Sequence, residues 1–146
     1  MPVYDNYRRI PMRLWHYDLL PYLPKTQLMA QWRELNLIYR QSPQHILINY
    51  IYEYDKVHLL AYSLLVLNEL TDCDLNMDNF NEYFKNTRLL SAGDIYSFKP
   101  FPGHHNKRYL RQCFFNLQEK YDRGQKDFTS DIYKRLVEHY KSIINP

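Results

Sequence analysis

Apolar residues recur at helical spacing through most of the chain. The clearest case is 28-LMAQWRELNLIYR-40, in which an apolar residue returns every three or four positions. The resulting stripe consists of Leu28, Trp32, Leu35 and Tyr39. Pro24 can open this helix, because proline is favoured in a first helical turn. The segment 56-KVHLLAYSLLVLNEL-70 is apolar on nearly all sides and follows a possible N-cap, Asp55, which predicts a central helix.

Further helices are predicted from start signals and periodicity at residues 42–54, 78–86, about 106–121 and 130–144. In the first of these, Ser42 is the expected N-cap and Pro43 the first helical residue. Thr129 or Ser130 is expected to cap the last. Proline-containing residues 1–23 are expected to be extended or irregular, and residues 87–104 are expected to form a long loop.

The predicted fold is therefore all-α, because strand-like alternation is nowhere convincing. We expect a compact helical bundle with a long irregular N-terminal segment. Residues 1–11 are taken as an N-terminal extension and residues 12–146 as a single helical domain. A chain of 146 residues, with 45% hydrophobic and 16% aromatic residues, is large enough to bury a core.

The sequence also bears on the cellular compartment and on metal binding. No apolar run is long enough to span a bilayer and no secretory signal is visible, so we expect a cytoplasmic protein without a membrane partner. Cys73 and Cys113 form neither a disulfide framework nor a metal motif, and we interpret both as buried thiols in a reducing compartment. No histidine or cysteine pair has metal-binding helical spacing, so no metal site is predicted.

The net charge of +3 is unevenly distributed. Residues 1–41 carry six basic and three acidic side chains, whereas residues 42–96 carry three basic and eight acidic ones. Residues 97–126 carry seven basic and two acidic side chains. This concentration of positive charge is compatible with a polyanionic partner such as nucleic acid. The alternative is that an isoelectric point near 8.8 is ordinary and indicates no particular partner.

Three motifs carry a resemblance to a known family. They are 12-MRLWHYDLLPYLPKTQLMAQWREL-35, 42-SPQHILIN-49 and 104-HHNKRYLRQCFFNLQEK-120. Together they resemble bacterial members of the pyrimidine-dimer DNA glycosylase family, the family of phage endonuclease V. The resemblance implies a monomeric helical DNA repair enzyme that acts on damaged double-stranded DNA without a cofactor. It also implies combined glycosylase and abasic-site lyase activity.

The resemblance further implies which groups react. In the phage enzymes the α-amine of the processed N-terminus attacks the deoxyribose C1′ and forms an imine, and a glutamate supports the chemistry. That glutamate is matched here by Glu34, which follows Met12 at the same separation as in the phage enzymes. Arg33 matches an arginine that contacts the DNA backbone. An imine turns the sugar into an electron sink, so covalent catalysis divides one difficult step into two.

A helical wheel places Glu34 beside Gln27, Gln31 and Ile38, at the edge of the Trp32 face. Partial burial there would raise the carboxyl pKa toward a useful range. The alternative is a solvated Arg33–Glu34 pair on the helix surface.

The predicted DNA-binding residues are basic or imidazole side chains near this helix: Arg13, His16, Arg33 and Arg40. Arg33 and Arg40 project to another side from Glu34, where both can reach phosphates. His16 is expected either to hold a phosphate or to cap a turn. Any stacking on an unpaired base would come from Tyr17 or Tyr22.

The sequence also departs from the family pattern. Residues 1–11 precede the motif, so the Arg13 nitrogen is an amide and cannot act as the nucleophile. Removal of Met1 would free the secondary amine of Pro2, which could form the imine if the extension folded back to Glu34. The basic segment between the REL and SP motifs is reduced to 36-NLIYRQ-41, and Gln27 replaces a histidine. The alternative function is a non-catalytic DNA- or protein-binding module that retains the fold.

Overall fold

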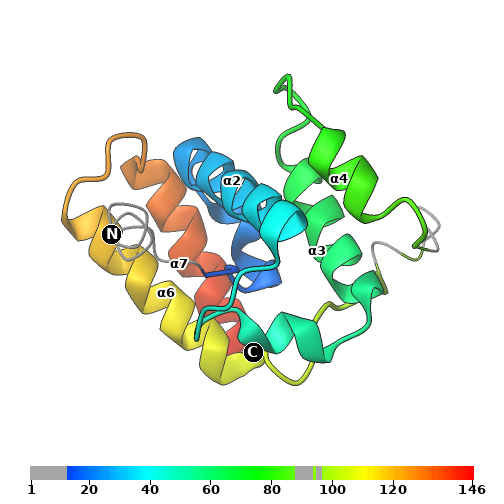
Figure 1. The fold of residues 1–146 in the computed structure, drawn as a ribbon. Coiled ribbons are helices and arrows are strands. Elements are labelled where there is room, and N and C mark those ends of the chain that lie inside the picture. Colours follow the sequence, from blue (N-terminus) through cyan, green and yellow to red (C-terminus); the bar gives the residue numbers. More distant parts are fainter. Residues whose placement is uncertain (1–12, 88–93, 95–96) are drawn as a thin grey trace.

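The computed structural model describes residues 13–87, 94 and 97–146. Its main helices are α2 (Lys25–Gln41), α3 (Lys56–Asn68), α4 (Asp78–Tyr83), α6 (Lys107–Asp122) and α7 (Ser130–Ile144). Two short 3-10 helices, η1 (Tyr17–Tyr22) and η2 (Asn49–Glu53), complete the regular structure. The described residues contain no strand, so the all-α prediction is confirmed (Figure 1).

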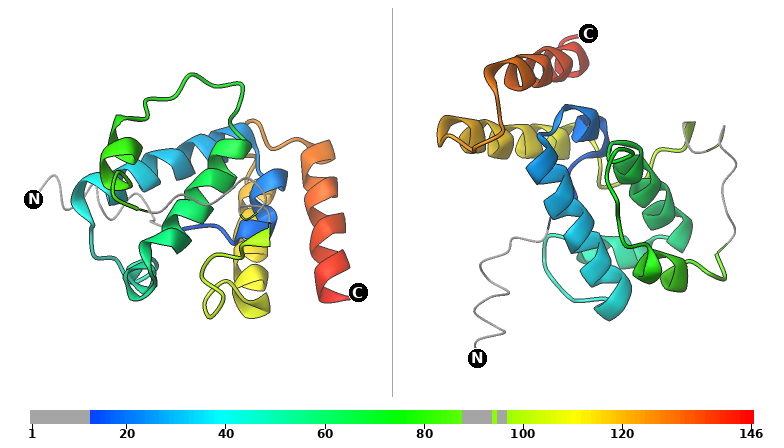
Figure 2. Two further views of the ribbon diagram at one scale, coloured as in Figure 1. Left: turned by 90° about the vertical axis from the view of Figure 1, so that its right-hand side faces the viewer. Right: turned by 90° about the horizontal axis from the view of Figure 1, so that it is seen from above.

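Helix α2 lies between two groups of helices. It packs against α3 and α4 on one side, while α6 and α7 contact each other on the other side (Figures 1 and 2). The 3-10 helix η1 joins the groups because it contacts α3, α6 and α7. The core therefore runs across the whole described part of the chain rather than between one pair of helices.

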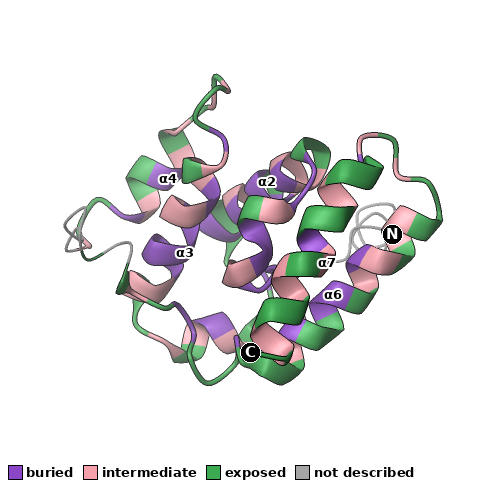
Figure 3. Ribbon diagram, turned by 180° about the vertical axis from the view of Figure 1, so that it is seen from behind, coloured by how far each residue is buried: buried purple, intermediate pink, exposed green. Residues whose placement is uncertain are grey.

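Helix α3 is central, as its nearly uniform apolarity predicted. Leu60, Ala61, Tyr62 and Val66 are each fully buried, and the five consecutive residues 59–63 are all buried; buried positions of the helix are purple in Figure 3. Burial of this many apolar side chains is the main favourable term in folding. Of the two cysteines, Cys113 is buried but Cys73 is only half-buried, so the prediction of two buried thiols was wrong for Cys73.

The predicted helix starts at Asp55 and Thr129 are confirmed. The Asp55 carboxylate accepts a hydrogen bond from the Val57 N–H at 3.0 Å, and the Thr129 hydroxyl accepts one from the Ile132 N–H at 3.2 Å. Each bond satisfies an amide that the helix itself leaves without a partner.

The predicted helix at residues 42–54 was wrong. Ser42 ends α2 instead of starting a new helix: it adopts a left-handed conformation with φ 45°, and its N–H donates to the Ile38 carbonyl at 2.9 Å. The Asn49 side chain then accepts from the His45 N–H at 2.7 Å, and such local side-chain bonds compete with helix formation. Only η2 forms in this stretch.

The irregular N-terminal segment is also partly corrected. Residues 17–22 form η1, and the His16 ring accepts a hydrogen bond from the Asp18 N–H at 3.1 Å at its start. Residues 1–12, which include Pro2, lie outside the described part. The predicted loop at residues 87–104 is described only in part, since residues 88–93 and 95–96 also lie outside; Asp94 and Ser97 are helical.

Candidate active site

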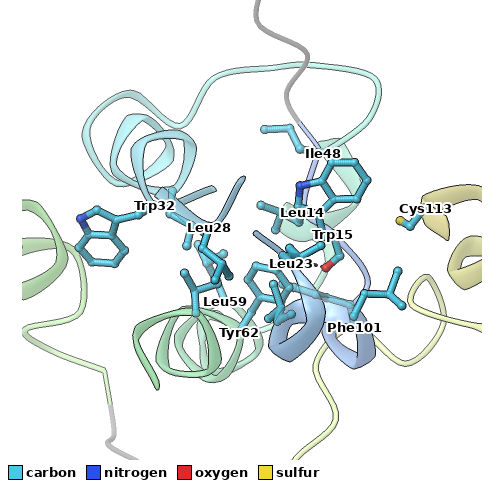
Figure 4. Packing of buried hydrophobic residues seen from close by; sticks show 14 of the residues in the cluster. Leu14, Trp15, Leu23, Leu28, Trp32, Ile48, Leu59, Tyr62, Phe101 and Cys113 are labelled. Carbon is cyan, nitrogen blue, oxygen red and sulfur yellow. Dashed lines mark hydrogen bonds between the residues drawn. The ribbon is translucent and has the colours of Figure 1, made fainter. Parts of the chain in front are cut away.

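Residues 13–16 form a short non-helical segment, here called segment 13–16, that runs through the centre of the fold. Figure 4 shows Leu14 and Trp15 with Leu28 of α2, Tyr62 of α3 and Cys113 of α6 around them. Leu14 is fully buried and Trp15 is 4% exposed. A segment in this position needs partners for its backbone groups, because an unpaired buried amide or carbonyl is costly.

Gln31 of α2 supplies two of these partners. Its Nε2 donates to the Arg13 carbonyl at 2.9 Å, and its Oε1 accepts from the Trp15 N–H at 2.8 Å. The Tyr62 hydroxyl of α3 lies 2.6 Å from the Trp15 carbonyl oxygen and 2.9 Å from the Gln31 Oε1, and its one hydrogen is shared between these acceptors (Figure 4 shows Tyr62 beside Trp15). Gln31 and Tyr62 are fully buried, so these bonds are shielded from water.

Helix α6 and the residues before it hold the other side of segment 13–16. The Tyr109 hydroxyl donates to the Leu14 carbonyl at 2.6 Å. The His16 ring and the His105 carbonyl are joined by a hydrogen bond of 2.9 Å, in which the His16 Nε2–H donates because its Nδ1 already accepts from the Asp18 N–H. Three helices thus fix the path of the backbone that leads to Arg13.

Glu34 faces the nitrogen at the start of this path. The Arg13 N–H donates to the Glu34 Oε2 at 3.2 Å, and Glu34 is 9% exposed. Burial raises the pKa of this carboxyl to about 7, because the charged form loses hydration. The Arg13 N–H bond and the positive charges of Arg33 and Lys120 act in the opposite direction but do not outweigh burial. The sequence-based expectation of a raised pKa is therefore supported.

Glu34 lines a cavity of about 120 Å³. The cavity wall comes from segment 13–16, α2 and α6, and its residues are Arg13, Trp15, Gln27, Glu34, Asn116 and Lys120. The Arg13 guanidinium carbon lies 6.0 Å from the centre of the Trp15 ring and 5.7 Å from that of Tyr109. The site thus combines an acid that can change its protonation state near neutral pH with two cationic side chains, a combination suited to an anionic substrate.

The comparison with known proteins bears on this same region. Residues 12–81 match the family model of pyrimidine dimer DNA glycosylases. The resemblance drawn from the motifs is confirmed over this segment, which contains segment 13–16, α2 with Glu34 and α3. The matched family acts on DNA, as its description states. No match was found among curated proteins or among solved structures.

The structure places the predicted DNA-binding residues in different environments. Arg13 is half-buried at the cavity, whereas Arg33 and Arg40 are exposed on α2. His16 is 3% exposed and both its ring nitrogens are engaged within the protein, which is the arrangement of a turn cap. Pro2 lies outside the described residues, so its predicted role stays a prediction.

Tyr17 and Tyr22, suggested for base stacking, line a second cavity of about 290 Å³ rather than the one at Glu34. The Tyr22 ring stacks on His139 of α7 at a centroid distance of 4.3 Å. This cavity is larger than that of Glu34. The smaller cavity is nevertheless the candidate site, because it alone of the two is lined by Glu34 and Arg13.

Sequence reasoning did not identify Gln31, Tyr62, Asn116 or Lys120 as parts of the site. The sequence could have indicated Gln31, because a polar side chain at the border of an apolar stripe needs a hydrogen-bond partner when it is buried. Lys120 ends the motif at residues 104–120, but nothing in the sequence linked it to Glu34, because only tertiary structure brings α6 to the cavity.

In the part of the chain that the structure describes, no helix is both long and apolar enough to cross a membrane. Among the same residues, no group of three or more histidine, cysteine or acidic side chains could hold a metal ion.

Proposed function

We propose that this protein removes damaged bases from double-stranded DNA and cleaves the strand at the resulting abasic site through an imine. One observation carries the proposal: the Arg13 nitrogen lies 3.2 Å from the Glu34 carboxylate at a cavity. The family resemblance implies that a chain-start amine and a glutamate act together, and these are the two positions that it matches. Segment 13–16 is held from three helices, which supports a site whose geometry is preorganised.

Glu34 would serve as both acid and base. With a pKa of about 7, both protonation states are populated near neutral pH. The protonated form can donate to the departing base. The ionised form can stabilise positive charge at C1′ and remove a proton from C2′ during strand cleavage.

The reaction also needs a free amine, because an amide nitrogen such as that of Arg13 is not a nucleophile. The secondary amine of Pro2, released by removal of Met1, is one proposed source. Arg13, Arg33 and Arg40 would contact phosphates of the duplex, whereas His16 would organise η1.

The direct test is incision of a duplex that contains either a pyrimidine dimer or a single abasic site. We expect the wild-type protein to cleave both, and Glu34→Gln to slow cleavage by about 100-fold or more, the range of general acid–base catalysis. Glu53→Gln, at an exposed glutamate of η2, is the matched control and should cleave like the wild type. If Glu34→Gln cleaves as fast as the control, Glu34 has no role in the reaction.

The second candidate is a non-catalytic DNA-binding protein with the same fold. It is favoured by the amide character of the Arg13 nitrogen, whose hydrogen bond occupies one oxygen of Glu34. A protein of this kind would bind duplex DNA with a steep salt dependence and would leave both substrates intact.

A further inference from the structure

The cavity at Glu34 contains an amine that the family pattern does not use. Of the described residues that line it, Lys120 alone carries a primary amine. The Arg13 nitrogen is an amide, so the position that the family resemblance assigns to the nucleophile is blocked in this sequence. We propose that the Lys120 Nζ forms the imine with the abasic sugar and that Glu34 is its acid–base partner. This inference rests on the proposed function and specifies its nucleophile.

The position of Lys120 favours this role. It lies in the last turn of α6, one turn after Asn116, which lines the same cavity. The same face of α6 carries the buried residues Cys113 and Leu117, and it packs toward segment 13–16. Lys120 is half-buried and lines the cavity, and a lysine in such a place can pack its stem along the protein while its amine stays in water.

The charge of Lys120 acts on the Glu34 carboxyl group. Both residues line the cavity, and the positive charge of Lys120 lowers the pKa of Glu34. Among the described residues, no carboxylate forms an ion pair with Lys120. No ion pair within the described part of the chain therefore holds the amine away from a bound sugar.

The reaction balances without a further reactant. Glu34 takes a proton from the Lys120 ammonium group, and the neutral amine attacks the C1′ aldehyde of the ring-opened abasic sugar. Loss of water, with a proton supplied by Glu34, gives the iminium. The Glu34 carboxylate then removes a proton from C2′, the C3′–O bond breaks, and the 3′-phosphate leaves with the electron pair. Hydrolysis of the unsaturated imine restores the Lys120 amine.

The test is to locate the covalent bond in the full chain. The protein is incubated with a duplex carrying one abasic site and sodium borohydride, which reduces an imine to a stable amine. The adduct is then digested and its peptides are analysed by mass spectrometry. We expect the sugar remnant on Lys120. Lys120→Arg keeps the positive charge but presents no amine, and it should reduce adduct to background.

Lys107→Arg, at the exposed start of α6, is the matched control and should form adduct like the wild type. Binding of a duplex with a tetrahydrofuran abasic analogue, which lacks the aldehyde, should be unchanged in Lys120→Arg within about twofold, because the charge is retained. A remnant on an α-amine or on another lysine overturns the inference but leaves the proposed function standing. Absence of both adduct and incision overturns the inference and the proposed function together.

Discussion

Glu34 is a buried carboxyl group that accepts one hydrogen bond from the described residues, the bond donated by the Arg13 N–H. A carboxyl in such a place destabilises the fold when it ionises, because one N–H donor replaces only part of its lost hydration. A functional role gives a reason for keeping it there, since a glutamine could accept the same Arg13 hydrogen bond without the charge.

Because ionised Glu34 destabilises the fold, the free energy of unfolding should depend on pH. The folded protein holds the Glu34 proton up to a pKa of about 7, whereas the ordinary glutamate pKa of 4.5 applies to the unfolded chain. The folded state therefore binds more protons between these values, and its stability falls as pH rises from about 4.5 through about 7. Glu34→Gln removes this loss and should be more stable than the wild type at pH 8 by up to roughly 3 kcal/mol.

Urea unfolding of both proteins at pH 5 and pH 8 measures the effect. The difference in unfolding free energy between Glu34→Gln and wild type should grow from pH 5 to pH 8. An equal difference at both pH values would show that the carboxyl titrates alike in the folded and unfolded states, contrary to its observed burial.

Some residues of the candidate site could be predicted from the sequence alone. The spacing of Glu34 from Trp32 and Gln31 on one helix correctly placed the acid at the border of the buried face. The motif from Met12 to Leu35 carried the family resemblance because its residues are close in sequence, and the family model matches residues 12–81. Lys120 could not be found in this way, because its place at the cavity of Glu34 depends on how α6 sits in the folded molecule.

At the scale of elements, helices with their own start signals were predictable. Asp55 and Thr129 cap α3 and α7 as expected, since a cap is a local interaction. Ser42 is the counterexample: the Ser-Pro pair that suggested a start instead follows α2 directly, and Ser42 takes the left-handed turn that ends that helix. A local signal of this kind cannot distinguish an end from a start when a preceding helix reaches it.

The contact of α2 and α3 with segment 13–16 gives an element-scale prediction. Tyr62→Phe removes the hydroxyl that bonds the Trp15 carbonyl and Gln31, and should cost about 1–3 kcal/mol of unfolding free energy. It should also slow incision, because the path leading to Arg13 loses one of its fixed points.

Tyr39→Phe is the matched control. Tyr39 is also buried and bonds Ser63 of α3 at 2.5 Å, but it packs among Phe80, Tyr83 and Phe84 near α4. Its loss should lower the free energy of unfolding by a similar amount while incision, measured well below the unfolding temperature, stays near wild type. Equal loss of incision in both variants would mean that stability alone, and not segment 13–16, controls activity.

At the scale of the whole molecule, the uneven charge predicts how DNA is held. Arg33 and Arg40 are exposed on α2, the helix that carries Glu34. Each alanine variant should weaken duplex binding and reduce the slope of log affinity against log salt concentration by about 0.9, the value for one phosphate contact.

Lys85→Ala is the control for this experiment. Lys85 follows α4, pairs with Glu82 at 2.6 Å and belongs to the acidic stretch of residues 42–96. Its replacement should leave the slope unchanged. The measurement is fluorescence anisotropy of a duplex with a tetrahydrofuran abasic analogue at several salt concentrations; slopes for Arg33→Ala and Arg40→Ala equal to that of Lys85→Ala would place the DNA on another face.

The central claim is that Glu34 assists an amine in attacking a sugar. The most direct measurement is the yield of covalent protein–DNA adduct when the full chain, as wild type and as Glu34→Gln, is mixed with an abasic-site duplex and borohydride. We predict a stable adduct for the wild type and little or none for Glu34→Gln at equal DNA binding. A wild-type protein that binds the duplex and forms no adduct would contradict the account.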